Sequence, residues 1–403
     1  MIFIKVRINV KWEQRKLGEF YSFKNGLNKG KEYFGHGVPI VNYTDVYHHR
    51  SLELKDLKGR VELTSNEVKN NSAKTGDLFF TRTSETIDEI GFPAILLSAS
   101  NDTVFSGFLI RVRPIGGDPL DLLFKKYVFY TKTFRQEMMR KSTITTRALT
   151  SGKNLSSMIM AFPDEIKEQN SIGNLLTKLD NLITLQQRKL RQLKQLKMVM
   201  LQQLFVDKNN QQPNLRFKKF NGDWELHKLG DVILDYKKKN NNDLLPVLTS
   251  SFQGIEYQEK HFGSKQKHDT SDYNVLPKEY MTYRNRSDNG YFRFNINKLG
   301  ITGIVSKFYP VFTTINTNKQ FLASYLNYNP RLKNYFKVVS VGTSQHVLSL
   351  KNLKKTNLLF PSKSEQDQIG YFFNLLNKII FLQQNKLTQL TTLKKYLLQK
   401  MFI

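Results

Sequence analysis

Cysteine is absent from the 403-residue chain, so disulfide bonds and thiolate metal sites are excluded. Acidic residues are scarce, with Asp+Glu 34 against Lys+Arg 62 and a formal net charge of +28. No run of 18 apolar residues occurs, so the sequence offers no candidate for a membrane-spanning helix. The charge excess indicates a polyanionic partner, nucleic acid before an anionic membrane. The composition also fits a reducing cytoplasm, where we expect this protein to reside, without membrane attachment.

The length and the 39% apolar content are sufficient for two or more hydrophobic cores, so at least two domains are expected. At the start of the chain, the apolar alternation of MIFIKVRINVKW is broken by Lys5 and Arg7. This pattern predicts a strand rather than a signal peptide.

The chain contains a long internal repeat. The stretch LQQRKLRQLKQLK at 185–197 recurs as LQQNKLTQLTTLK at 382–394, identical at nine of thirteen positions. Around it, Glu168-Gln169 is echoed by Glu365-Gln366 at the same offset along the chain. Other matching pairs are Phe162-Pro163 with Phe360-Pro361, Ile172-Gly173 with Ile369-Gly370, and Phe205 with Phe402.

A second echo opens each half of the chain, because Trp12-Glu13 and Leu17-Gly18 reappear as Trp224-Glu225 and Leu229-Gly230. The order is therefore a variable block followed by a helix, twice. Such a long period indicates duplication of a whole module rather than a solenoid. We predict two globular domains at 1–162 and 224–360, two spacer helices at 163–206 and 361–403, and a linker at 207–223.

Each repeated helix carries a heptad pattern. Residues 164–206 contain no proline and one glycine, Gly173, and apolar residues recur at a and d positions through five heptads. This pattern predicts a coiled-coil seam in each copy. The expected seam residues are Leu179, Ile183, Gln186, Leu190 and Leu193 in the first copy, and Leu376, Ile380, Gln383, Leu387 and Leu390 in the second.

Polar residues interrupt both seams at the same two places, Gln186/Gln383 and Lys197/Lys394. A buried polar pair lowers stability but fixes register, because a shifted pairing leaves an amide unsatisfied. Alternatively, these side chains lie at the edge of the seam and are solvated. The pattern alone leaves both interpretations open.

The duplication suggests how the helices pair. Ordinary coiled-coil dimers do not need a large block between their helices, so we expect the two helices to pair with each other as struts between two globular units. Equivalent halves joined in this way have a pseudo-two-fold axis within one chain. Such symmetry suits DNA, where a protein two-fold axis meets two half-sites.

More than half of the net charge lies in the variable blocks. Residues 12–162 hold 22 basic and 16 acidic residues, and residues 224–360 hold 20 and 10. Within them, basic residues alternate with polar and aromatic ones, a composition that can hydrogen-bond phosphates and base edges. Gly152 and Gly342 lie at matching places, ten and eighteen residues before their Phe-Pro pairs, so the two loops are expected to correspond only loosely. Our candidate DNA-binding residues are Arg82, Thr83, Thr145, Arg147, Lys153, Arg284, Arg286, Arg293, Ser344, Gln345 and His346.

Motifs for catalysis are missing. No phosphate-binding loop, no dinucleotide-binding glycine pattern and no Asp/Asn-Pro-Pro-aromatic motif of amino-methyltransferases occurs. Asp56 with Glu67-Val68-Lys69 resembles a nuclease pattern, but the second block has no counterpart. His48-His49 lacks partners at ligand spacing. We expect no catalytic residues and no metal site.

The chain resembles the specificity subunits of type I restriction–modification systems. The resemblance rests on Pro213-Asn214-Leu215-Arg216-Phe217, followed by Phe220–Glu225 and Lys228-Leu229-Gly230, which is similar to the opening of a target-recognition domain. It extends over two such domains, each followed by a helix of the Phe-Pro…Glu-Gln…Ile-Gly…Leu-Gln-Gln kind. The first copy lacks the Pro-x-Leu-Arg-Phe leader and has residues 1–11 in its place.

The resemblance implies an α+β fold, with two mixed α/β target-recognition domains separated by two long antiparallel coiled-coil helices. It also implies a non-catalytic subunit that reads a split sequence in double-stranded DNA, one half per domain. Two methylation subunits that bind S-adenosylmethionine would dock on the helices, and restriction subunits would use ATP and Mg²⁺. The chain itself would bind no cofactor. The apolar faces of the helices exceed one seam, and their additional residues Leu182, Leu185 and Leu196 would contribute to that docking.

Two other classes of function remain open from the sequence. One is a stand-alone or architectural DNA-binding protein without enzyme partners, which would purify stably by itself. The other is an enzyme with an unrecognised site, which would cleave or methylate DNA as the pure chain.

Overall fold

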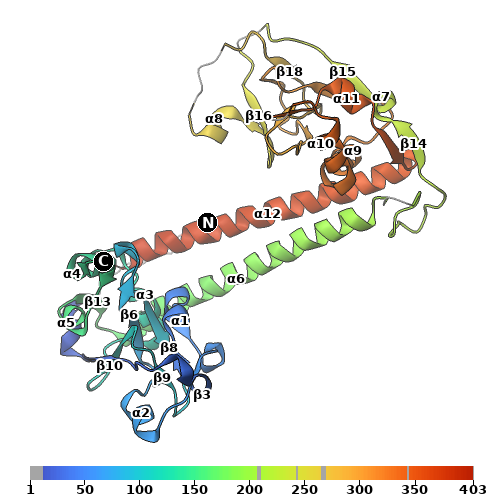
Figure 1. The fold of residues 1–403 in the computed structure, drawn as a ribbon. Coiled ribbons are helices and arrows are strands. Elements are labelled where there is room, and N and C mark those ends of the chain that lie inside the picture. Colours follow the sequence, from blue (N-terminus) through green and yellow to red (C-terminus); the bar gives the residue numbers. More distant parts are fainter. Residues whose placement is uncertain (1–11, 207–209, 242–243, 265–268, 343–344, 403) are drawn as a thin grey trace. The chain divides into compact units, whose positions relative to one another are not determined.

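The computed structural model describes residues 12–206, 210–241, 244–264, 269–342 and 345–402 (Figure 1). The chain divides into two compact units, with residues 1–186 and 386–403 in unit 1 and residues 187–385 in unit 2. Both units mix strands with helices. The N-terminal strand predicted for MIFIKVRINVKW lies outside the described residues except for Trp12.

Unit 1 is built on a five-stranded sheet with the order β2-β10-β6-β8-β4. Buried apolar residues of its strands, such as Phe79 and Phe80, form cores on both faces of the sheet. The sheet consists of β2 (Tyr21–Asn25), β10 (Leu109–Pro114), β6 (Leu78–Thr81), β8 (Pro93–Leu96) and β4 (Ser51–Leu52). Smaller sheets are β5 (Arg60–Val61), β3 (Phe34–Val41) and β9 (Val104–Phe105), and β11 (Thr143–Ile144), β12 (Ala148–Leu149) and β7 (Thr83–Ser84). Its short helices are α1 (Tyr43–His48), α2 (Ser65–Asn70), α3 (Leu122–Val128), α4 (Lys132–Lys141) and α5 (Gly152–Ser156).

Unit 2 has a four-stranded sheet with the order β15-β23-β19-β21 and several two-stranded ribbons. The sheet consists of β15 (Ile233–Tyr236), β23 (Val311–Thr314), β19 (Met281–Thr282) and β21 (Asn295–Ile296). The ribbons include β16 (Leu248–Ser251) with β17 (Gly254–Tyr257), β18 (Asn274–Leu276) with β22 (Gly303–Val305), and β20 (Arg286–Ser287) with β24 (His346–Val347). Its short helices are α7 (Leu229–Val232), α8 (Gln258–Phe262), α9 (Lys319–Tyr328), α10 (Pro330–Val339) and α11 (Leu350–Lys354).

The first and last strands of each block pair with each other. In unit 1, β1 (Trp12–Lys16) is antiparallel to β13 (Ile159–Pro163). In unit 2, β14 (Glu225–Lys228) is antiparallel to β25 (Asn357–Phe360). Glu13 lies opposite Phe162, and Glu225 lies opposite Phe360. The echo that opens each half and the echo that closes each block therefore meet in one pair of strands.

Two long helices follow the blocks, α6 (Ile166–Gln203) and α12 (Lys363–Met401), and each contributes a segment to both units. The ten predicted seam residues are buried or half-buried, whereas Leu182, Leu185, Leu196, Leu375 and Leu382 beside them are exposed. This burial pattern is the one that a heptad seam requires.

The helix segments run antiparallel inside each unit. In unit 1, Asp180 of α6 forms an ion pair with Lys394 of α12, and Leu176 shares a core with Phe402. As residue numbers fall along α6, the partner numbers on α12 rise, which defines opposite directions. In unit 2, Phe205 just after α6 stacks on Phe373 near the start of α12, with ring centroids 5.9 Å apart.

The repeated phenylalanines at the two helix ends fill equivalent positions. Phe402 packs against Trp12 and Phe124 in unit 1, with ring centroids 6.0 and 5.4 Å away. Phe205 packs against Trp224 and Phe321 in unit 2, at 6.3 and 5.4 Å. Each block therefore buries the end of the helix that follows the other block. Aromatic pairs of this kind add to the free energy gained from their buried area.

The repeated Glu-Gln and Ile-Gly pairs hold each long helix against its block. The Gln169 amide donates to the carbonyls of Pro119 and Pro163, both at 2.9 Å, and accepts from the backbone of Asp121 at 2.7 Å. Gln366 donates to Pro361 and accepts from the backbone of Asn318 in the same way. A buried amide with its donors and acceptor satisfied fixes the distance between two elements.

The repeated glycines allow that close approach. A Cβ at Gly173 would lie 2.7 Å from the backbone of Leu123 and Phe124 at the start of α3. A Cβ at Gly370 would lie 2.3 Å from the side chain of Asn318, which caps α9. Both glycines therefore stand where a side chain has no room.

The polar residues that interrupt the seams differ in their surroundings. Gln186 and Gln383 are buried, at 9% and 8% exposure, so they do not lie at a solvated edge. Lys197 and Lys394 instead bond to side chains within their own units, Lys197 to Tyr328 at 3.0 Å and Lys394 to Asp180. A register-setting role for the glutamines stays a prediction.

Candidate nucleic-acid interface

The short β11-β12-β7 sheet of unit 1 brings four of the predicted residues together. Thr83 lies in β7, opposite Leu149 of β12, and Arg82 directly precedes it. The turn between β11 and β12 holds Thr145, whose backbone N–H donates to the carbonyl of Arg147 at 3.1 Å. The Arg147 guanidinium is exposed and lies 3.0 Å from the Glu85 carboxylate. Lys153 follows on α5, also exposed.

The ribbon β20-β24 of unit 2 collects the second group. Arg286 and His346 lie on paired strands, and the Arg286 guanidinium carbon is 3.8 Å from the centroid of the Phe308 ring. Gln345 donates its amide to Asp288 at 3.0 Å, and His346 Nδ1 lies 2.9 Å from the Ser340 hydroxyl. Arg284 is exposed just before the ribbon. Ser344 lies outside the described residues.

These two sites share one pattern of backbone hydrogen bonds. Arg82 donates its backbone N–H to Phe108 at 2.9 Å and accepts from Thr150 at 3.0 Å. Asn285 does the same with Phe308 and Leu348, both at 2.9 Å. Equivalent positions therefore hold an arginine in unit 1 and an asparagine in unit 2.

The turns beside these strands match as well. Ser151 accepts from the backbone of Asn154 at the start of α5, and Ser349 accepts from Asn352 at the start of α11. The predicted match of Gly152 with Gly342 is therefore wrong, because Gly152 lies at the position of Leu350, one residue after the capping serine.

Polar side-chain pairs beside the strands also match, since Arg147–Glu85 and Gln345–Asp288 both span 3.0 Å. Two equivalent backbones thus present different side chains.

Arg293 is held apart from the β20-β24 ribbon. Its guanidinium donates to the hydroxyl of Tyr328 at 3.1 Å, and the same oxygen accepts from Lys197 at 3.0 Å. Burial alone would raise the pKa of Tyr328, but the positive charges and hydrogen bonds of Arg293 and Lys197 hold it below its usual value. This arrangement fixes Arg293 relative to α6.

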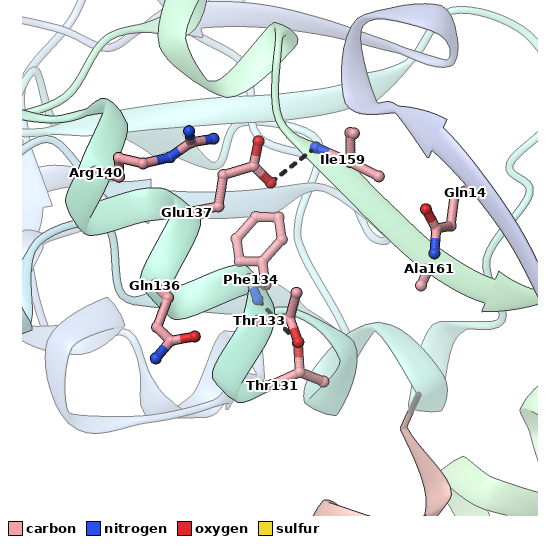
Figure 2. Close-up of a pocket in the computed structure, with 9 residues that line it drawn as sticks. All are labelled: Gln14, Thr131, Thr133, Phe134, Gln136, Glu137, Arg140, Ile159 and Ala161. Carbon is pink, nitrogen blue, oxygen red and sulfur yellow. Dashed lines mark hydrogen bonds between the residues drawn. The ribbon is translucent and has the colours of Figure 1, made fainter.

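A surface pocket of about 370 Å³ lies elsewhere in unit 1 (Figure 2). Figure 2 shows Glu137 and Arg140 of α4 facing the β1-β13 pair, with the Glu137 carboxylate accepting the backbone N–H of Ile159 at 3.2 Å. No predicted DNA-binding residue lines it. Two of its polar lining groups have structural roles, because the Thr131 hydroxyl accepts the backbone N–H of Phe134 at the start of α4 and Glu137 accepts that of Ile159.

The nuclease-like pattern has a structural explanation. The Glu67 carboxylate accepts from the backbone of Thr64 at 2.9 Å as part of a capping box and bonds Lys29 at 2.8 Å. Asp56 accepts from the backbone of Glu53 at 3.0 Å.

Within the part of the chain that the structure describes, no three histidine, aspartate or glutamate side chains form a group that could hold a metal ion. None of the described helices is long and apolar enough to span a membrane.

Comparison with known families decides the relationship. The model of the type I restriction modification DNA specificity domain matches the chain twice, over residues 9–195 and 221–392. The chain belongs to this family. Each match covers one block and most of the helix that follows it, so the resemblance proposed from the sequence is confirmed.

Two solved structures match the chain over nearly its whole length. A crystal structure of the type I restriction–modification system S subunit from M. genitalium has a TM-score of 0.59 with 15% identity, covering 99% of this chain and 98% of that one. The HsdS subunit from Thermoanaerobacter tengcongensis has a TM-score of 0.47 with 13% identity, covering 97% and 96%. No curated protein sequence matches the chain. The first of these likenesses supports the α+β fold with two domains and two long helices.

One exposed feature of the second specificity domain was missed in the sequence. The β16-β17 ribbon ends in Phe252 and Gln253, and the Phe252 side chain is 83% exposed. The Arg293 guanidinium carbon lies 4.9 Å from the centroid of its ring. The signal available was Gly254 after two serines and an aromatic residue, a composition typical of a hairpin turn.

Proposed function

We propose that this chain is the DNA sequence-specificity subunit of a type I restriction–modification enzyme. Each specificity domain reads one half of a bipartite site in double-stranded DNA. The observation that carries the proposal is the double family match, together with two short sheets of equal backbone pattern but different side chains. Two domains of this kind suit a site with two different halves.

The candidate base-contacting side chains follow from the same comparison. Arg147 and Gln345 hold equivalent exposed or half-exposed positions, and each is paired with a carboxylate. Arginine favours guanine in the major groove, and glutamine favours adenine. The lysines and arginines around them would contact phosphates and set the protein's position on the duplex.

The long helices would serve the assembly rather than base reading. Exposed apolar side chains outside the seam, Leu182, Leu185 and Leu196 on α6 and Leu375 and Leu382 on α12, offer surfaces for two methylation subunits. At 38 residues, α6 is about 57 Å long, so we propose that the helices also set the gap between the half-sites.

In this proposal the chain binds no cofactor and catalyses no reaction. The methylation subunits supply S-adenosylmethionine chemistry, and restriction subunits supply ATP- and Mg²⁺-dependent cleavage. The pure chain incubated with DNA, Mg²⁺ and S-adenosylmethionine should then neither cleave nor methylate. Co-expression with methylation subunits should yield a stable complex. A chain that purifies and binds its DNA equally well alone would favour a stand-alone DNA-binding protein.

A domain exchange tests the reading of half-sites. Replacing residues 12–162 with the first block of another family member should change one half of the methylated motif, measured by methylation sequencing of the host DNA. The second half and the gap should stay as they were. A change in both halves would contradict independent reading by the two domains.

A helix insertion tests the role of α6 and α12 in spacing. Four residues inserted near Gln192 add about 6 Å of helix, which corresponds to one or two base pairs at roughly 3.4 Å each. The coiled coil can absorb four residues as a stutter. The variant should keep both half-site sequences and prefer a longer gap between them. An unchanged gap would show that the helices do not set it.

A further inference from the structure

The tip of the β16-β17 ribbon in unit 2 combines exposure with rigidity. Phe252 and Gln253 occupy the two-residue turn between Ser251 and Gly254, which are paired across the ribbon. Both turn side chains are exposed. The Phe252 ring is 83% exposed and is therefore accessible to a binding partner.

The turn is held by side chains beneath it. Asn295 of β21 is 7% exposed and donates its amide to the Ser250 hydroxyl and the Ser251 carbonyl, both at 2.8 Å. The Gln253 backbone N–H donates to the Ser251 hydroxyl at 3.0 Å. Gly254 has φ of +130°, a conformation that side-chain-bearing residues rarely adopt. These bonds fix the direction in which the turn points.

The Phe252 ring also lies against the Arg293 guanidinium, which is itself held by hydrogen bonding. Arg293 is 4.9 Å from the ring centroid and donates to Tyr328, which in turn accepts from Lys197 of α6. The cation holds the ring from one side and leaves the rest of it exposed. A positive charge directly behind the tip also favours approach to a polyanion.

We infer that the β16-β17 tip enters the major groove and reads an A·T base pair in the half-site of the second domain. The groove is wide enough for a two-stranded ribbon. Gln253 offers the amide that pairs with the N6 and N7 atoms of adenine, and Phe252 offers an apolar face for the thymine 5-methyl group. This inference rests on the proposed function, because it assigns a base pair to one of its two domains.

The test measures binding of the full-length chain, co-expressed with its methylation subunits, to duplexes that contain its methylated motif. In the second half-site each thymine is replaced in turn by uracil, which removes the methyl group, and each adenine by 7-deazaadenine, which removes N7. For the wild-type complex, one uracil position should raise Kd about fivefold, as expected for one buried methyl group. A 7-deazaadenine in the same or the adjacent base pair should raise it by about 5- to 100-fold.

Variants of the tip should remove these sensitivities one at a time. Phe252→Ala should weaken binding about tenfold and become indifferent to uracil, whereas Phe252→Leu should retain part of that sensitivity. Gln253→Ala should become indifferent to 7-deazaadenine. Leu226→Ala, which removes another side chain of unit 2 that is 66% exposed, is the matched control and should bind as the wild type does.

The outcomes separate the two proposals. If the wild-type complex prefers its motif but Phe252→Ala keeps the uracil sensitivity, or behaves as Leu226→Ala does, the inference about the tip is overturned. If no base of the second half-site responds to loss of a methyl group or N7, it is overturned as well. If the wild-type complex binds all duplexes equally, the proposed function itself fails.

Discussion

The lysine that is repeated on the two long helices has a different hydrogen-bonding partner in each unit. In unit 1, Lys394 pairs with Asp180, which also accepts from the hydroxyl of Tyr127 at 2.8 Å. In unit 2, the residue at the position of Asp180 is Asn377, and Lys197 bonds Tyr328 instead. The repeated lysine therefore bonds the other long helix in unit 1, through Asp180 of α6, and the block in unit 2, through Tyr328 of α9. The comparison teaches that duplication preserved backbone positions while the polar contacts changed.

The two glutamates of the repeat, Glu365 and Glu168, differ even more in their burial and in their partners. Glu365 is 1% exposed and accepts a two-point ion pair from Arg216, at 2.9 and 2.7 Å. Arg216 belongs to the Pro-x-Leu-Arg-Phe leader, which the first copy lacks. The equivalent Glu168 has one carboxylate oxygen that is buried and has no hydrogen-bond partner among the described residues. Burial is the main cause that raises the pKa of Glu168, and the nearby charge of Glu165 raises it further. The Trp12 indole acts in the opposite direction.

The largest expected effect concerns the phenylalanines at the helix ends. Phe205 contacts the rings of Trp224, Phe321, Tyr325 and Phe373, whereas Phe402 contacts those of Trp12 and Phe124. Phe205→Ala should lower the free energy of unfolding of unit 2 by about 3–5 kcal/mol, and Phe402→Ala should lower that of unit 1 by less. Hydrogen exchange followed by mass spectrometry would assign each loss to its unit. Equal losses would mean that the two aromatic clusters are energetically equivalent.

The ion pair between Arg216 and Glu365 should follow in size. Arg216→Ala leaves a buried carboxylate unpaired and should destabilise unit 2 by about 2–4 kcal/mol, measured by urea unfolding. The double variant Arg216→Met with Glu365→Met should recover most of that loss, because it removes the unpaired charge. Hydrogen exchange in unit 1 should not change. A double variant as unstable as Arg216→Ala would show that the loss comes from packing rather than charge.

The two helix glycines provide a smaller contrast. At Gly173 the obstacle to a Cβ is backbone, so Gly173→Ala should cost about 1–3 kcal/mol of stability. At Gly370 the nearest atoms belong to the Asn318 side chain, which can rotate away and give up its cap of α9, so Gly370→Ala should cost about 1 kcal/mol. Thermal unfolding of the two variants compares them directly. A larger loss at Gly370 would refute this order.

The smallest effect is a pH dependence. Because the pKa of Glu168 is raised in the folded state, folding takes up a proton there, and the stability from this group falls as pH rises above the unfolded-state value near 4.3. Glu168→Gln cannot ionise, so at pH 7 it should be more stable than the wild type by up to about 0.5 kcal/mol. Below pH 4 the two proteins should unfold alike. A Glu168→Gln variant less stable than the wild type at pH 7 would show that the charge is satisfied.

Much of the fold could be predicted because the duplication is visible as residues that recur at equivalent positions in both halves of the sequence. Trp12 and Trp224, and Phe205 and Phe402, recur because the same contacts are built twice. The long helices follow from heptads without proline. The small sheets that carry Thr83 and Arg286 could not be aligned in this way. Their strands are two residues long, and pairing between distant segments decides their register.

The sequence by itself determined the duplicated module, the two long helices, the basic charge that indicates an anionic partner, and membership of the specificity-domain family. These properties depend on composition and on spacing along the chain. Only the tertiary structure decided that Gly152 corresponds to Leu350, that Lys197 bonds Tyr328 of the second block, and that Lys394 bonds Asp180 of α6. It also placed Phe252 on the cation of Arg293 at a ribbon tip. These contacts join residues distant in sequence, and their geometry depends on hydrogen-bond register and packing, which no local pattern encodes.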